Sequence, residues 1–60
     1  MDIFAAAMLG QVKIVQAILK AFPDARHLRG PHGIPLLNHA QAGGQEAALV
    51  VELLQTRELA

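Results

Sequence analysis

The sequence IPLLNHAQAG, residues 34–43, decides the fold of this 60-residue chain. Pro35 suits the first turn of an α-helix, because that turn has no use for the amide hydrogen that proline lacks. The apolar side of this helix is made of Leu36, Leu37 and Ala40. The stretch ends at Gly43, and Gly44 comes next, so a short helix that stops at a glycine turn is predicted.

A longer helix is predicted beyond this turn, from Gln45 to about Thr56. Glu52 lies on or near its polar side. Apolar residues recur at helical spacing on the other side, at Leu49, Val50, Leu53 and Leu54. The glycine turn reverses the chain, so the two helices are expected to run antiparallel.

The first half of the chain has the same organisation. Residues 2–9 are nearly all apolar helix formers, and Asp2 is placed to accept hydrogen bonds from the free amides of a first turn. Gly10 interrupts this pattern. An amphipathic helix is then predicted over residues 12–21, ending where Phe22 precedes a proline. Its expected apolar side is Ile14, Val15, Ile18 and Leu19.

The two halves match at a fixed period, which indicates one structural unit used twice. Gly10 and Gly43 lie 33 residues apart, and residues 23–33 between the halves predict a loop built from turns. The neighbouring matches are Ile3 with Leu36 and Ala7 with Ala40. The second half has two extra residues before its leucine-rich helix, which predicts a longer turn at residues 44–47. Without this insertion Glu52 would fall opposite a core leucine, and burying an unpaired acid costs on the order of several kcal/mol.

This pattern resembles the ankyrin repeat. The period, the paired helices and the string Ile34-Pro35-Leu36 with Ala40 and Gly43 carry the resemblance, which covers almost the whole chain. It implies an all-α fold with two stacked helix-turn-helix repeats, a short α-solenoid. Residues 1–60 would then be a single ankyrin-like module, with repeat one at residues 1–29 and repeat two at residues 30–60.

Three residues of the second repeat depart from the family's pattern. Ile34 stands where threonine is usual, and Leu37 stands where histidine is usual. The hydroxyl and imidazole that tie adjacent loops together in the family are therefore missing. His39 replaces an alanine and puts a larger polar ring into a tight inner helix.

The resemblance also implies where a partner binds, because ankyrin-like modules generally bind through loop tips and the exposed side of the inner helices. Carried over by position, that surface is Gly30, Pro31 and Gly33 at the tip, Gln41 and Ala42 on the second inner helix, and Met8 and Leu9 on the first. The apolar Met8 and Leu9 have an alternative explanation, contact with the long loop. The stripe of Lys13, Gln16 and Lys20 is read as the solvated side of its helix, with a docking face as the alternative.

The composition and the apolar pattern argue against nucleic-acid-binding, membrane-spanning and secreted proteins. Five Lys and Arg balance five Asp and Glu, so no attraction to nucleic acid or anionic lipid is expected. No apolar run approaches the roughly 18 residues that span a bilayer. The first residues do not fit a secretory signal, so a cytoplasmic location is the default expectation.

Catalytic and metal-binding residues are not expected. The chain has no cysteine and no serine, and its lone threonine is Thr56. The three histidines, His27, His32 and His39, do not have the spacing of a compact metal site. No catalytic, cofactor-binding or metal-ligating residue is therefore assigned, and no cofactor is expected.

The sequence predicts a non-catalytic protein-binding module with an unidentified protein partner. The alternative is a structural role, as an end piece or fragment of a longer repeat array or as a homo-oligomer, because two repeats fall short of the roughly three that repeat folds need. The uncapped end at residues 58–60 suggests such a fragment. A small enzyme or metal protein is the third hypothesis, and it would require a bound cofactor.

Overall fold

The computed structural model describes residues 2–56, which form helices joined by turns. The elements, in which η denotes a 3-10 helix, are α1 (Ile3–Met8), α2 (Val12–Ala21), η1 (Pro23–His27), η2 (Pro31–Gly33), α3 (Leu36–Ala42), η3 (Gly44–Ala47) and α4 (Ala48–Gln55). Over residues 2–56 there is no β-strand, and one isolated antiparallel bridge pairs Arg29 with Pro35. The all-α prediction is confirmed. Residues 58–60, on which the expectation of a longer chain was based, lie outside the described residues.

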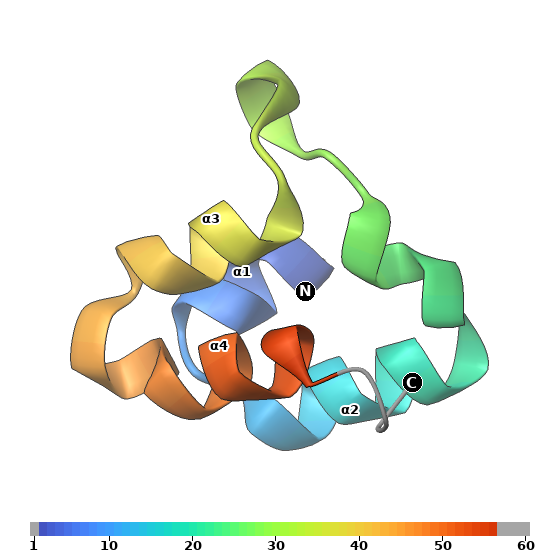
Figure 1. The fold of residues 1–60 in the computed structure, drawn as a ribbon, viewed down its shortest axis with the longest axis horizontal. Helices are drawn as coiled ribbons and strands as arrows, with labels where there is room; N and C mark the ends of the chain where they lie inside the picture. Colours follow the sequence, from blue (N-terminus) through green and yellow to red (C-terminus); the bar gives the residue numbers. More distant parts are fainter. Residues whose placement is uncertain (1, 57–60) are drawn as a thin grey trace.

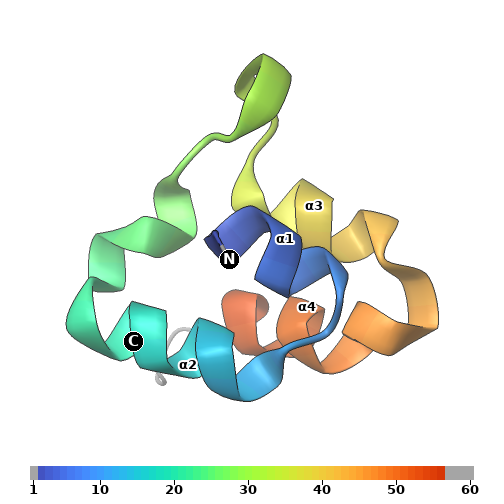
Figure 2. The ribbon, with the colours of Figure 1, turned by 180° about the vertical axis from the view of Figure 1, so that it is seen from behind.

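Helices α1 to α4 are arranged as two contacting pairs. Helix α1 packs on α2 and α3 packs on α4, and the pairs meet through α1 with α3 and α2 with α4 (Figures 1 and 2). The 3-10 helix η1 continues from the end of α2 and reaches α3, so it closes one end of the molecule. The segment around η2 projects from the helical body as a hairpin (Figure 1).

Local sequence signals explain where the first two helices begin and end. The Asp2 carboxylate accepts a hydrogen bond from the Ala5 amide at 2.8 Å, which caps α1 as predicted. Helix α2 covers the predicted residues, and Phe22 ends it with an amide that donates to the Ile18 carbonyl at 2.7 Å. Pro23 then starts η1, whose first turn does not need the amide that proline lacks.

The core is built from small and aliphatic side chains. At the α1–α3 contact, Ala6, Ala7 and Ala40 are fully buried, which lets the two helices approach closely. The largest fully buried side chains are Leu36, Val15 and Val50. Burial of each such side chain contributes about 1.5–3 kcal/mol to stability relative to leaving it exposed.

The two glycine turns approach each other through their backbones. A Cβ atom on Gly10 would collide with the carbonyl oxygen of Glu46 in η3. A Cβ atom on Gly43 would collide with the carbonyl oxygen of Met8 and lie 2.7 Å from the Ala47 methyl group. Both glycines are therefore required for space, and Gly10 also for its left-handed φ of 73°.

The fourth helix begins later than predicted. Residues 44–47 form η3, and α4 starts at Ala48 instead of Gln45. The longer turn expected there from the extra residues is confirmed. Glu52 is exposed, as expected, while Val50 and Leu53 are buried. Of the other two residues expected on the apolar side, Leu54 is half-buried and Leu49 is 65% exposed.

Three further details differ from the sequence-based expectations. Ile14 is 40% exposed, because the buried side of α2 is narrower than predicted and centres on Val15 and Leu19. Pro35 precedes α3 as its N-cap residue instead of occupying its first turn. The loop of residues 23–33 contains two 3-10 helices, which the turn signals did not distinguish from irregular turns.

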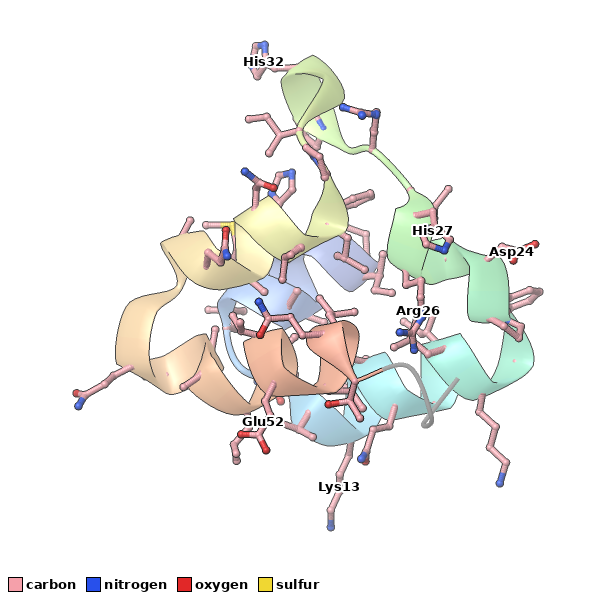
Figure 3. All side chains as sticks on the ribbon, viewed as in Figure 1. Lys13, Asp24, Arg26, His27, His32 and Glu52 are labelled. Atoms are coloured by element: carbon pink, nitrogen blue, oxygen red, sulfur yellow. The ribbon has the colours of Figure 1, made fainter. Side chains whose placement is uncertain are left out.

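Arg26 ties η1 to the last turn of α4. Its Nη1 atom donates to the Leu54 carbonyl at 3.3 Å, and Figure 3 shows the side chain directed towards the helical body. A cation at a helix carboxyl terminus is favoured by the helix dipole. The contact joins segments 28 residues apart and helps to fix η1 at this end of the molecule.

We predict that three glycine-to-alanine substitutions will destabilise the chain to different degrees. Gly10→Ala adds left-handed strain of about 1–2 kcal/mol to an overpacking cost of about 1–3 kcal/mol, so it should leave the chain largely unfolded. Small domains of this size rarely exceed about 3–5 kcal/mol of stability. Gly43 has a φ of −75°, outside the left-handed region, so Gly43→Ala should lower the free energy of unfolding by the overpacking cost alone. Urea unfolding followed by far-UV circular dichroism measures each loss.

Gly44→Ala is the matched control. Gly44 has a left-handed φ of 64°, similar to that of Gly10, but a Cβ atom added to it would meet no other atom within 4 Å. Its substitution should cost only the strain, about 1–2 kcal/mol. Equal losses for Gly10→Ala and Gly44→Ala would contradict the close approach of the two turns.

Candidate protein-binding surface

The projecting loop is a short hairpin held by backbone hydrogen bonds. The Gly30 amide donates to the Ile34 carbonyl at 2.8 Å, and the Leu36 amide donates to the Leu28 carbonyl at 3.1 Å. These bonds flank the bridge between Arg29 and Pro35. The base of the hairpin is therefore fixed to the start of α3.

The end of the hairpin is also closed by hydrogen bonds. The Gly33 amide donates to the Gly30 carbonyl at 3.0 Å, and the Gly33 carbonyl accepts a 3.0 Å bond from Arg29 Nη1. His32 adopts a left-handed φ of 60° at the apex and is exposed (Figure 3). We call residues 29–33 the hairpin tip.

The hairpin rests on two aromatic rings from the inner helices. The Phe4 and His39 ring centroids are 5.0 Å apart, with the ring planes tilted by 58°. A Cβ atom on Gly30 would lie 2.8 Å from Phe4 Cδ1 and 3.0 Å from His39 Nε2, so a side chain there would force these rings to shift. The rings of α1 and α3 thus support the hairpin from below, and Gly30 provides the space for that contact.

His39 Nε2 is a buried polar atom without a hydrogen-bond partner. Such an atom costs about 1–3 kcal/mol relative to a satisfied one. The side chain as a whole is half-buried, and its ring faces Phe4. The expectation that His39 packs as a helix residue is confirmed, with this unfavourable atom as its consequence.

The ends of the inner helices form a second exposed area. Met8 and Leu9 are 40% and 58% exposed, and Gln41 and Ala42 at the end of α3 are also exposed. The Met8 carbonyl lies against Gly43, which places the two helix ends next to each other. The turn after α1 lies at the opposite end of the molecule from η1 in both views (Figures 1 and 2). This position favours a solvent-facing role for Met8 and Leu9 over contact with η1.

The seven residues assigned from the sequence fall into two groups. Pro31 and Gly33 are exposed at the hairpin tip, while Gly30 is half-buried beneath Phe4 and His39. The second group consists of Met8, Leu9, Gln41 and Ala42. Helix α3 separates the groups, because the tip precedes its amino terminus and Gln41 and Ala42 are at its carboxyl terminus. A partner that contacts both groups must extend along α3.

Comparisons with protein-family models, with curated proteins and with solved structures find no match for this chain. The assignment of a site therefore depends on the geometry of the chain itself.

Among residues 2–56, no group of three or more His, Cys, Asp or Glu side chains could hold a metal ion. No helix in this part of the chain is long and apolar enough to cross a membrane.

Sequence reasoning missed three residues that shape this surface. Phe4 and His39 support the hairpin, and Arg29 is fixed across its tip. The contact between Phe4 and His39 joins residues 35 positions apart, and no local pattern encodes such a pair. The segment Arg29-Gly30-Pro31 does carry a signal for Arg29, a cation next to a turn, but its glycine and proline indicate turn chemistry first.

We predict that His39→Leu raises the free energy of unfolding by about 1 kcal/mol. Leucine keeps an apolar contact with Phe4 and removes the unsatisfied Nε2 atom. Chemical denaturation of the two proteins measures the difference. The control is His27→Leu in η1, where the side chain is exposed and the change should stay within about 0.5 kcal/mol. A less stable His39→Leu variant would show that the imidazole contributes favourably.

Proposed function

We propose that this chain is a non-catalytic protein–protein interaction module that binds a protein partner through the hairpin tip and the exposed ends of its inner helices. In this proposal the two helix pairs are stacked ankyrin-like repeats, and residues 1–29 and 30–60 are the repeat units. The matched burial of Val15 and Val50, both with 0% exposure, supports this description. The module works in the cytoplasm, an assignment that depends on the sequence alone.

The observation that carries the proposal is the fixed hairpin that projects from the helical body. Projecting segments usually have many backbone conformations, and ordering them upon binding costs free energy. Here backbone hydrogen bonds and the rings of Phe4 and His39 order the segment in the unbound chain. A partner therefore meets a surface that is already organised.

The apolar part of the surface is supplied by the inner-helix ends. Met8 and Leu9 are exposed next to polar Gln41 and small Ala42, so a partner side chain can bury apolar area there without displacing a charge. Methionine is suited to this role because its unbranched side chain adapts to different surfaces. A few such contacts on a rigid support account for most of the affinity in typical interfaces.

Nucleophilic catalysis by a hydroxyl or thiol has almost no candidate residue in this chain. The chain contains neither cysteine nor serine, and Thr56, its one threonine, uses its hydroxyl to donate to the Glu52 carbonyl at 2.7 Å. Charge balance between the five basic and five acidic residues gives no reason to propose nucleic acid as the partner.

The alternative function, self-association or stacking against a further repeat, is favoured by a different surface. An open groove between α2 and α4 is lined by Val12, Gln16, Leu49, Glu52, Leu53 and Thr56. Leu49 is 65% exposed at this groove. A second copy of the chain or a further repeat would cover such apolar area. Self-association is therefore the second candidate function.

We predict that charged substitutions on the proposed surface weaken partner binding by at least about tenfold, or 1.4 kcal/mol. The variants are Met8→Glu with Gln41→Glu on the inner helices, and Pro31→Glu on the tip. All three side chains are exposed, so the fold should survive. A partner captured from the source cell with the intact chain provides the ligand, and calorimetric titration of that purified partner gives each affinity.

The matched control is Lys13→Glu with Lys20→Glu on α2. Lys13 points away from the hairpin (Figure 3), so these substitutions should leave the affinity unchanged. If both surface variants fold and bind the partner as tightly as the intact chain, the proposal is wrong.

Sedimentation equilibrium distinguishes the alternative. The binding-module proposal predicts a folded monomer at low micromolar concentration. A dimer that dissociates only with unfolding, and that Leu49→Glu disrupts, would establish self-association instead.

A further inference from the structure

The acidic and basic side chains are distributed unevenly over the chain. Residues 25–45 contain no Asp or Glu, and this segment includes the whole hairpin and α3. Its basic and imidazole side chains are Arg26, Arg29, His27, His32 and His39. The carboxylates of the described residues belong to Asp2, Asp24, Glu46 and Glu52. Asp2 is occupied as the cap of α1.

Arg29 supplies the exposed cation of the hairpin tip. Arg26 is directed into the molecule, where it binds the Leu54 carbonyl (Figure 3). Arg29 is exposed and donates one hydrogen bond, from Nη1 to the Gly33 carbonyl at 3.0 Å. A guanidinium carries five N–H donors in a planar fork, so donors remain for a ligand after this bond is made. The same bond restricts the side chain and lowers the entropy lost when a ligand binds.

We infer that the hairpin tip binds an acidic segment of the protein partner, with the Arg29 guanidinium binding a carboxylate. This inference rests on the proposed function, because it names the chemistry of the partner at one part of the same surface. A guanidinium fork matches a carboxylate with two parallel hydrogen bonds, which a lysine cannot reproduce.

His32 supports this inference by its position. A left-handed backbone at a residue other than glycine costs about 1–2 kcal/mol, and glycine would remove that cost. The imidazole is exposed at the apex (Figure 3), and His32 is three residues after Arg29 in the sequence. A neutral or protonated imidazole can donate a hydrogen bond to a carboxylate, so it adds a second donor group at the tip.

Nucleic acid is the competing anionic ligand, and the structure favours a peptide. Binding of phosphate backbones depends on several cations arranged along one track. The tip has the single arginine Arg29, whereas Lys13 extends from the opposite side of the molecule, away from His32 (Figure 3). The apolar Ile34 beside the tip is 40% exposed and suits a peptide side chain better than a phosphate.

The experiment uses three probes and the full chain labelled with nitrogen-15. The first probe is a short blocked peptide that alternates Asp and Glu with Leu, and the second is the same peptide with Asn and Gln in place of the acids. The third is a short single-stranded DNA of mixed sequence. Amide and arginine side-chain NMR shifts report both the affinity and the residues that respond.

The acidic peptide should shift the signals of Arg29, His32 and Gly33, and its binding should weaken when salt rises from about 50 to about 500 mM. Arg29→Gln should weaken this binding by about three- to tenfold, because charge-assisted bonds to one exposed arginine are lost. Arg29→Lys should recover only part of the affinity. Lys20→Gln removes the same charge from α2 and should have no effect.

His32→Gly separates binding from stability. This variant should be at least as stable as the intact chain, because the left-handed strain is relieved, yet it should bind the acidic peptide more weakly. A variant that merely unfolds cannot give this combination. His32→Asn keeps a residue that tolerates the backbone and should be intermediate in stability.

Several results would overturn the inference. Equal shifts with the acidic and neutral peptides, no shift with either peptide, unchanged binding by Arg29→Gln, or tighter binding of the DNA at the tip would each do so. Failure here is distinguishable from failure of the proposed function. A captured partner that binds through Met8 and Gln41 but is insensitive to Arg29→Gln would leave the proposed function standing and remove this inference alone.

Discussion

The structure depends on the close approach of two glycine turns. Gly10 lies against the Glu46 carbonyl and Gly43 lies against the Met8 carbonyl, so each turn occupies space that any side chain on the other would need. This contact brings α1 against α3, where fully buried alanines allow a short distance between the helices. With a core this small, and without large buried rings, the chain relies on close contact between helices for its stability.

The same helix contact organises the proposed binding surface. Once α1 and α3 lie side by side, Phe4 and His39 meet and form the support on which Gly30 rests. The hairpin is then fixed by its backbone bonds and by Arg29 across its tip. The contact between α1 and α3 therefore determines both the packing of the core and the position of the hairpin tip. The unsatisfied His39 Nε2 atom is a local cost of that arrangement.

Much of the fold was predictable because its signals are local. The cap at Asp2, the glycine at position 10 and the break at Phe22 define the first two helices within the residues concerned. The two extra residues before α4 predicted the longer turn but not its 3-10 form, and α4 begins at Ala48 instead of Gln45. The residues that shape the proposed binding surface were harder to predict. Phe4 against His39 and Arg26 against Leu54 are contacts between distant residues, and they follow from the tertiary arrangement alone.

Nuclear Overhauser effects between the two turns test the close approach of the glycines most directly. The Gly10 Cα protons and the Ala47 amide lie on facing segments of the two turns. We expect a cross-peak for this pair in the folded chain. A well-dispersed helical spectrum in which this cross-peak is missing would contradict the arrangement, because the helix pairs would then meet in another way.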